Sequence, residues 1–268
     1  MNVRRCVVAL GTASVLAGCL AGSPWAGPAG ASPTTTTAPP STSSSSTTSL
    51  PSSSTTTVAP AQVLASAIAA AAGQRALDWR QTVTEGLDSY TQVTQAGRVD
   101  GTSSITVRAG KATLKLNWVL IGGTVYFNGN GGALSDALGF TTAAAKKEAG
   151  KWISATAGAG AVFQDLSSYL TVSSAITILD MVGEMTFLPA TTVQGQTVLG
   201  IQGIRLSEEE KVTETIYVRA TGTPLPVELS QTGQGAAGYT YFGPWGQPPT
   251  AKAPQSALKL SKTWLASS

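Results

Sequence analysis

The chain has 268 residues, of which 42% are apolar and only 12% are charged, and its formal net charge is +3. It contains no histidine and only two cysteines, which excludes a Ser-His-Asp triad and any site that needs an imidazole base or ligand. Arg4 and Arg5 supply two of the positive charges, and the remaining charge of about +1 is too small for a nucleic-acid-binding surface.

The first residues have the pattern of an export signal. Arg4 and Arg5 precede an apolar run from Cys6 to Gly18, which is shorter than the roughly 20 residues that a membrane-spanning helix requires. The run ends in Leu16-Ala17-Gly18-Cys19, which resembles the lipobox of bacterial lipoproteins. That resemblance implies cleavage of residues 1–18 as a signal peptide and attachment of lipid, including palmitate-like acyl chains, to Cys19.

Ordinary secretion is the alternative, because Ala29-Gly30-Ala31 is an acceptable cleavage site that lies well beyond the apolar run. Both interpretations predict an exported protein, and the lipobox favours one anchored to the outer face of the bacterial cytoplasmic membrane in the cell envelope. Cys6 would leave with the signal peptide and Cys19 would carry lipid. The folded part therefore has no thiol for a disulfide, a metal site or nucleophilic catalysis.

Residues 19–60 are rich in Ser, Thr and Pro and contain no apolar periodicity. Such a composition cannot form a packed core, so it predicts a disordered tether, which O-glycosylation could stiffen. A globular domain is expected over residues 61–268.

The first part of that domain predicts one helix followed by strands. Apolar residues at helical spacing, with Pro60 before them, predict a short helix over Gln62–Gln74. Loose or strict alternation then predicts strands over Leu77–Val83, Ile105–Arg108, Lys111–Leu120 and Thr124–Phe127. Short turns join these segments, as in an antiparallel meander.

The middle of the domain predicts helical or irregular structure, and strands return in the last third. The helical segments are Leu134–Gly139, Thr141–Ala149 and Phe163–Val182, with a short extended insert at Gly150–Ile153. The later strands are Thr197–Leu206, Val212–Ala220, Leu225–Ser230 and Gly238–Phe242. This order predicts an α+β fold with one large curved antiparallel sheet, a half-barrel whose concave face is covered by the helices.

Several segments resemble a known group of exported proteins. The chain is similar to lipoproteins of the LppX/LprG type and their LolA/LolB-like relatives over about residues 61–255. The segments that carry the resemblance are Gly122–Asn130, Leu134–Gly139, Ala149–Ile153, Val193–Val198, Ile216–Arg219 and Thr223–Val227. The resemblance implies a half-barrel around an apolar cavity and a role in binding or transferring an acylated lipid or glycolipid in the cell envelope.

The apolar faces of the predicted strands could form the wall of that cavity. The expected wall residues are Ile105, Val107, Ala112, Leu114, Leu116, Trp118, Leu120, Ile216, Val218, Leu225 and Val227. Alternating apolar residues also line ordinary filled cores. The alternative function is therefore a structural or adaptor lipoprotein with a filled core and a protein partner.

Other candidate chemistry is weak. Glu208-Glu209-Glu210 fits a solvated hairpin turn better than a cation site, and the spacing of Asp165, Asp180 and Glu184 selects no carboxylate pair for acid–base catalysis. The basic residues Lys146, Lys147 and Lys151 fit a solvated helix face better than a lipid-headgroup site. We therefore expect no enzyme activity, no cofactor and no metal, and the expected partners are the membrane and an acyl lipid.

Overall fold

A computed structural model describes residues 58–168, 170–206, 211–233 and 236–266. Cys19, the predicted signal peptide, the predicted tether up to residue 57, and Glu208-Glu209-Glu210 lie outside these residues, whereas Pro60, the last residue of the predicted tether, begins α2. The described chain forms a curved, open α+β half-barrel built on one large sheet, as the sequence predicts.

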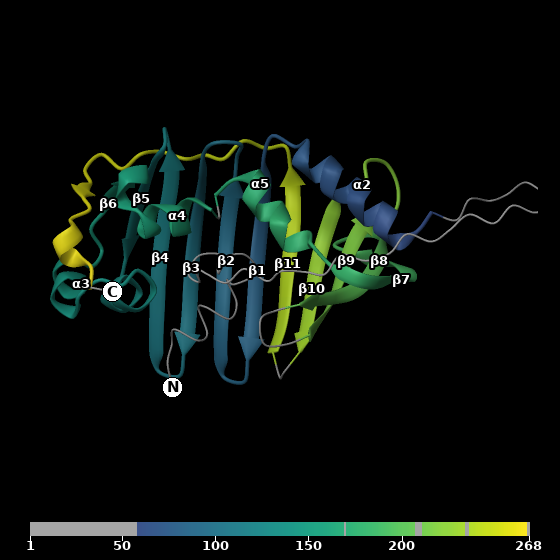
Figure 1. The fold of residues 1–268 in the computed structure, drawn as a ribbon, viewed down its shortest axis with the longest axis horizontal. Coiled ribbons are helices and arrows are strands. Elements are labelled where there is room, and N and C mark those ends of the chain that lie inside the picture. Colours follow the sequence, from purple (N-terminus) through teal and green to yellow (C-terminus); the bar gives the residue numbers. More distant parts are fainter. Residues whose placement is uncertain (1–57, 169, 207–210, 234–235, 267–268) are drawn as a thin grey trace, which may run out of the picture.

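The sheet contains twelve strands, and all its pairings are antiparallel except the short one between β12 and β6. Its spatial order is β12-β6-β5-β4-β3-β2-β1-β11-β10-β9-β8-β7 (Figure 1). The strands are β1 Leu77–Glu85, β2 Asp88–Ala96, β3 Gly101–Ala109, β4 Ala112–Ile121, β5 Thr124–Gly129, β6 Ile153–Thr156, β7 Val182–Val193, β8 Gln196–Leu206, β9 Lys211–Arg219, β10 Pro226–Gly233, β11 Ala236–Trp245 and β12 Leu258–Lys259.

Two meanders meet at the centre of this sheet. The first runs from β1 to β6 and the second from β7 to β11, and the pairing of β1 with β11 joins them. That pairing places Val83 opposite Gly238 and Glu85 opposite Ala236. The two runs of strands that the sequence predicts therefore form a single sheet.

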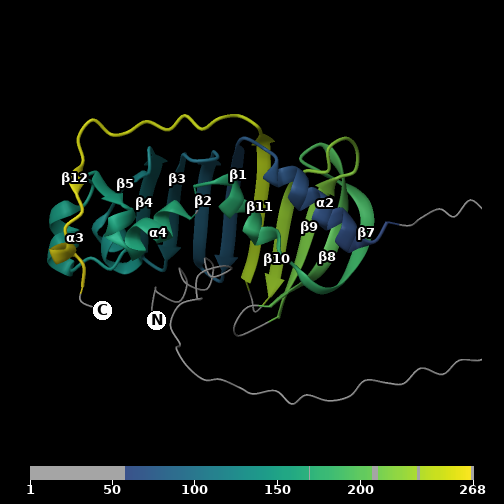
Figure 2. The same ribbon diagram turned by 45° about the horizontal axis from the view of Figure 1, so that its top comes forward.

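Helices lie on one face of the sheet, which we call the inner face; the opposite face is the outer face. Figures 1 and 2 show α2, α4 and α5 in front of the inner face. The helical elements are α2 Pro60–Ala72, η1 Ala133–Ala137, α3 Thr142–Glu148, η2 Ala157–Ala159, α4 Ala161–Ser167, α5 Val172–Ala175, η3 Ile176–Leu179 and η4 Lys262–Trp264. At 13 residues or fewer, all of them need packing against the rest of the protein to be stable.

The alternation predicted for Lys111–Leu120, which becomes β4, is confirmed from Leu114 onward. Leu114, Leu116 and Trp118 are buried on the inner face, while Lys115 and Asn117 between them are exposed. The register carries the same alternation into β3 and β5, where Val107 is opposite Leu114 and Phe127 is opposite Trp118. A period of two residues therefore decides which face each side chain occupies.

Two long strands were not predicted. In β2 the inward residues Gln92 and Thr94 are polar, so the segment lacks the apolar alternation by which a half-buried strand is recognised. In β7, an edge strand, nearly every residue is at least partly exposed, and Pro189 interrupts the pattern. Proline is tolerated at an edge because a ladder hydrogen bond is not needed there.

Two separate apolar clusters form the core. One segment, residues 157–168 and 170–181, contributes to both, and we call it the covering segment. The first cluster centres on β3–β6 with Leu166 and Leu170 of this segment, and the second centres on β1, β8–β11 and α2 with Val172 and Leu179. The covering segment therefore closes both halves of the inner face (Figure 2).

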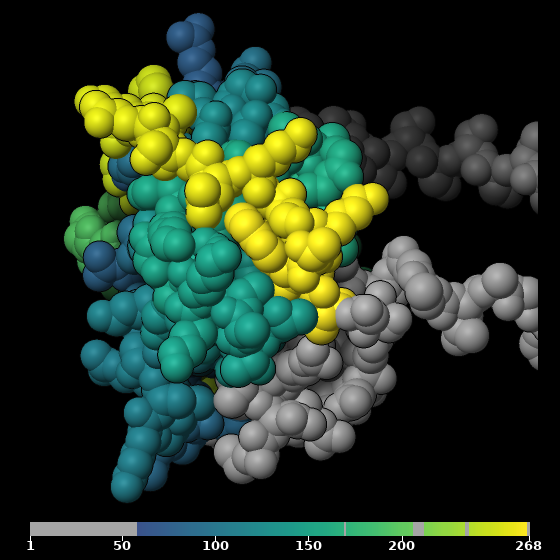
Figure 3. Space-filling view, turned by 90° about the vertical axis from the view of Figure 1, so that its left-hand side faces the viewer, coloured from purple at the N-terminus to yellow at the C-terminus, as the bar shows by residue number. Residues whose placement is uncertain are grey.

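The carboxyl-terminal segment closes the β6 end of the sheet. After β11 the chain runs along the end of the strands to β12, which pairs with β6 (Figures 1 and 2). Trp264 then packs on Phe140, with ring centroids 6.2 Å apart, and its carbonyl oxygen accepts a hydrogen bond of 2.8 Å from Thr141 N. Figure 3 shows this segment lying against the helical region at that end.

We predict that Gly101→Ala destabilises the protein, because Gly101 is where the covering segment approaches the sheet most tightly. A Cβ atom there would lie 2.4 Å from the carbonyl oxygen of Leu170 and 2.8 Å from that of Gln95, and both are backbone atoms. The free energy of unfolding, measured by chemical denaturation, should fall by roughly 1–3 kcal/mol.

Gly158→Ala is the matched control, because the nearest atom to its new Cβ is Thr156 Oγ1 at 4.0 Å. Equal stability of the two variants would show that the covering segment does not press on the sheet at Gly101.

Candidate functional site

The structure places most of the predicted wall residues on the inner face but divides them between the two clusters. Ile105, Val107, Leu114, Leu116, Trp118 and Leu120 belong to the first cluster, and Ile216 and Val218 to the second. Leu225 and Val227 are buried around the start of β10 but belong to neither cluster, and Ala112 is exposed where β4 begins. One continuous apolar wall is therefore not formed by these residues.

A buried polar network lies on the inner face of β2 and β3. Gln92 Nε2 donates to Thr94 Oγ1 and to Ser103 Oγ, each at 3.1 Å, and the two hydroxyl oxygens are 2.7 Å apart. Tyr90 OH donates to Gln92 Oε1. The side chains of Gln92 and Thr94 are almost completely buried. The sequence analysis missed this network because it did not predict β2; applying the period of two to residues 88–96 would have placed these side chains inward.

A second polar group lies on the inner face of β8–β10. Glu214 is fully buried, and its Oε1 is 2.7 Å from Arg205 Nε and accepts a hydrogen bond from Gln231. Arg205 also donates to the carbonyl oxygen of Ile178 in η3. Among the described residues, Glu214 Oε2 has no hydrogen-bond partner. Burial raises the pKa of the Glu214 carboxyl, while the charge of Arg205 and the hydrogen bond from Gln231 act in the opposite direction.

Three polar contacts attach the covering segment to the sheet. Trp118 Nε1 donates to the carbonyl oxygen of Leu166 at 2.9 Å, and Val172 N donates to that of Gly97 at 2.9 Å. The bond from Arg205 to Ile178 is the third. The sheet residues in these contacts are Trp118 on β4, Gly97 just after β2 and Arg205 on β8. The segment is therefore held over both halves of the inner face.

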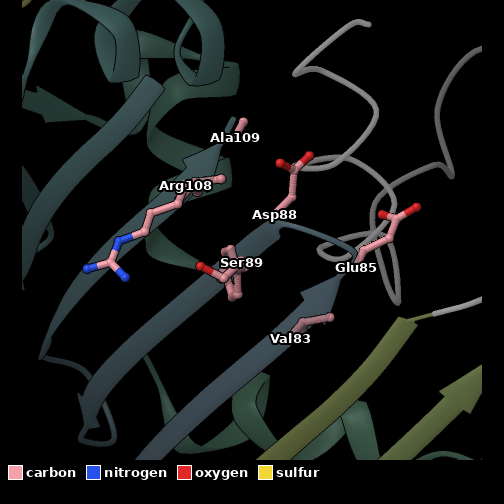
Figure 4. A pocket seen from close by; sticks show the side chains of 8 residues that line it. Val83, Glu85, Asp88, Ser89, Arg108 and Ala109 are labelled. Carbon is pink, nitrogen blue, oxygen red and sulfur yellow. The ribbon is translucent and has the colours of Figure 1, made fainter. Parts of the chain in front are cut away.

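A small pocket lies where the β1–β2 and β3–β4 hairpins turn. Val83, Glu85, Asp88, Ser89, Arg108 and Ala109 line it together with Tyr90 and Val107 (Figure 4). Its volume is about 10 Å³, which is room for about one water molecule. Sites for drug-sized ligands measure about 300–1,000 Å³, so this pocket cannot hold an alkyl chain in the closed arrangement.

A larger hollow lies on the outer face. It has a volume of about 380 Å³ and spans β1–β4 and Trp152, the residue before β6. Asp78, Gln95 and Asn117 contribute polar side chains, and Val93 and Val119 contribute apolar ones. The sequence analysis assigned no function to these residues, because their polar alternation is typical of any solvated sheet face.

The remaining candidates form no recognisable site. Asp165, Asp180 and Glu184 lie on α4, after η3 and on β7, and burial raises the pKa of Asp165. Within the described ranges no group of three or more Asp, Glu, His or Cys residues could hold a metal ion. No helix of the described chain is both long and apolar enough to cross a membrane. Lys151 forms an ion pair with Glu148 at 3.1 Å, and Lys147 lies 3.9 Å from the same carboxyl group.

We predict that Arg205→Leu costs about 3–5 kcal/mol of stability at pH 7, because it leaves the Glu214 carboxylate buried without a positive charge. The loss should shrink as the pH falls. The folded-state pKa of Glu214 is raised, so its penalty exists above that pKa and disappears as the carboxyl group becomes protonated. Denaturation curves from pH 4 to pH 8 measure the effect.

The double variant Arg205→Leu/Glu214→Leu is the control, since replacing a whole buried ion pair by apolar residues is often neutral or stabilising. A double variant no more stable than the single one, or a loss independent of pH, would contradict this account of the pair.

Comparison with known proteins identifies the fold. No protein-family model matches the chain, and no curated protein sequence matches it either. LprF from Mycobacterium bovis is similar in structure, with a TM-score of 0.52 at 12% sequence identity, over 73% of this chain and 96% of that one. The Mycobacterium tuberculosis lipoprotein LppX gives 0.46 at 10% identity, over 71% and 98% of the two chains. An uncharacterised conserved protein from Thermus thermophilus gives 0.37 at 9% identity, over 75% and 97%.

At these identities the likeness concerns the fold alone, and of these three structures LprF gives a TM-score above 0.5. The half-barrel is therefore the fold that LprF has. This confirms, at the level of architecture, the resemblance to lipoproteins of the LppX/LprG type.

Proposed function

We propose that this protein is an exported, lipid-anchored lipoprotein that binds a hydrophobic ligand with acyl chains between the sheet and the covering segment, and transfers it within the cell envelope. The observation that carries the proposal is that one run of short helices supplies buried side chains to both apolar clusters. A half-barrel closed in this way can expose part of both clusters by moving a single segment.

The energetics of acyl chains favour such an interior. Moving a sixteen-carbon chain from a membrane into water costs about 13 kcal/mol, at about 0.8 kcal/mol for each methylene group. A carrier has to offset nearly all of that with apolar contacts. The side chains around Leu116 and Trp118 on one side and Ile201 and Ile216 on the other provide two such surfaces.

The covering segment has to move before a ligand enters, because its own buried side chains, Leu166 and Leu179 among them, pack against the sheet. The segment contains helices of three to seven residues, which are marginal without tertiary contacts. It is attached through the three polar contacts at Trp118, Gly97 and Arg205. Opening also has to expose the apolar side chains that the segment buries in both clusters, so a bound acyl chain must replace those contacts.

A structural or adaptor lipoprotein is the alternative function. The dense packing of buried side chains in both clusters favours it, because a filled core needs no opening and leaves the surface as the functional part. The ligand-binding proposal and this alternative differ in one measurable property, which is whether an acyl chain enters the protein.

We predict that Trp118→Phe accelerates uptake of a fluorescent sixteen-carbon fatty acid by the full chain carrying Cys19→Ala. Phenylalanine keeps most of the ring in the core but removes the hydrogen bond to Leu166. Losing a net stabilisation of about 1 kcal/mol should raise the population of the open state, and hence the uptake rate, about fivefold. Stopped-flow fluorescence measures the rate.

Trp79→Phe is the matched control, because Trp79 is buried on the same face and its Nε1 has no hydrogen-bond partner among the described residues. Its uptake rate should match that of the parent protein. If no variant takes up the fatty acid and native mass spectrometry finds the purified parent protein empty, the adaptor function replaces ligand binding.

We predict that Cys19 carries the lipid anchor. Metabolic labelling with a palmitate analogue should tag the wild-type chain and leave Cys19→Ala unlabelled, because only the Cys19 sulfur can accept the diacylglyceryl group at the lipobox. Two or three acyl chains give a stable anchor, so the wild type should sediment with membranes and the variant should be released. Equal labelling of both proteins would rule out this anchor and leave ordinary secretion.

A further inference from the structure

The hollow on the outer face has the dimensions of a ligand site. Most of its lining residues face outward, and Thr94, Ser103 and Trp118, whose side chains belong to the inner face, also contribute to it. Its volume of about 380 Å³ falls within the range of about 300–1,000 Å³ that is usual for small-molecule sites. The cross-strand register places Asp78 opposite Gln95, Gln95 opposite Thr102, and Ser104 opposite Asn117. Four neighbouring strands therefore present their polar side chains to the same space.

The lining is polar but not basic. It offers a carboxylate at Asp78, amides at Gln95 and Asn117, and hydroxyl groups at Thr102 and Ser104, and no lysine or arginine belongs to it. The one charged side chain of the lining is negative, and the cation beside it, Arg80 on β1 opposite Val93, lies outside the lining. The groups present are hydrogen-bond donors and acceptors suited to a neutral ligand rich in hydroxyl groups.

Hydrogen bonds already orient both amide side chains of the lining. Gln95 Nε2 donates to Asp78 Oδ2 at 3.3 Å, and its Oε1 accepts from Thr250 Oγ1 at 3.3 Å. Asn117 Nδ2 donates to Asn128 Oδ1 at 3.0 Å. These bonds fix the planes of the amides, and within the described residues no hydrogen bond engages Asn117 Oδ1. The hollow therefore has polar groups held in place before a ligand arrives.

Apolar surface completes the site. Trp152 is half-buried at one side of the hollow, and Val93 and Val119 belong to its lining on the strands. An indole ring provides a large, rigid apolar surface, and the C–H face of a sugar ring can lie flat on it. Aromatic and aliphatic surface beside oriented amides is a combination that matches the two kinds of surface on a pyranose ring.

We propose that this hollow is a binding site for a neutral carbohydrate, with Trp152 stacking on one sugar ring and Asn117, Gln95 and Asp78 bonding its hydroxyl groups. The site lies on the opposite face from the covering segment, so a carbohydrate and an interior ligand can bind at the same time. The exported half-barrel would thereby attach to a polysaccharide surface while its inner face remains available.

The test is binding of the full chain carrying Cys19→Ala to an array of neutral, phosphorylated and sulfated oligosaccharides, followed by titration calorimetry with the best neutral one. Trp152→Ala should weaken binding roughly tenfold and Asn117→Ala about threefold, through loss of the ring contact and of one neutral hydrogen bond. Phosphorylated and sulfated oligosaccharides should bind more weakly than their neutral counterparts.

Tyr239→Ala is the matched control, since Tyr239 is an aromatic residue on the outer face of β11, 43% exposed and outside the hollow. It should bind the oligosaccharide like the parent protein. Ser104→Trp fills the hollow from an exposed position and should abolish binding without removing any buried group. Thermal melting verifies the folding of every variant.

Absence of binding to any neutral oligosaccharide overturns the proposal. So does a Trp152→Ala variant that binds as tightly as the parent protein, a Tyr239→Ala variant that is weakened equally, or a preference for anionic oligosaccharides. Fatty-acid uptake should be the same in the parent protein and in Asn117→Ala, so failure of this site is distinguishable from failure of the interior ligand site.

Discussion

The pairing of β1 with β11 is the contact on which the rest of the architecture depends. It joins the last strand of the second meander to the first strand of the first one, so that both share a single inner face. Twelve strands at about 4.8 Å spacing make a surface about 50 Å across, measured along the sheet. The longest helix, α2, reaches only about 20 Å. No single helix can cover that surface, and the covering segment therefore consists of several short helices that pass from one half to the other.

The sequence predicts this architecture well wherever apolar residues alternate with polar ones. The pattern of Lys111–Leu120 predicts both the strand and the face on which Leu114, Leu116 and Trp118 are buried. Val212, Ile216 and Val218 were correctly predicted to share one face of β9. The pattern failed where polar side chains are buried. Gln92 and Thr94 are buried but polar, and Glu214 lies fully buried between apolar neighbours on the same face. Each has a side-chain partner on another strand, and such partners are known only after the strands have paired.

The functional surfaces were less predictable than the fold for the same reason. The wall residues were assigned to one cavity because they share an alternation pattern, yet the pattern does not say which strands are neighbours. The pairing places β4 and β9 in opposite halves, with β3, β2, β1, β11 and β10 between them. The hollow beside Trp152 likewise depends on four strands and on a residue that precedes a fifth. Its signal in the sequence is only a set of ordinary polar residues.

The position of α2 has a mechanical consequence. Its first residue, Pro60, is also the last residue of the predicted tether, so tension applied to the amino-terminal end of the chain reaches α2 before any strand. Leu64 and Ala67 of α2 are buried in the second cluster, whereas α2 contributes nothing to the first. Pulling from that end would load the contacts of α2 with the second cluster before those of the first cluster. The two halves of the molecule are thus unequal under load, and the half nearer the tether yields first.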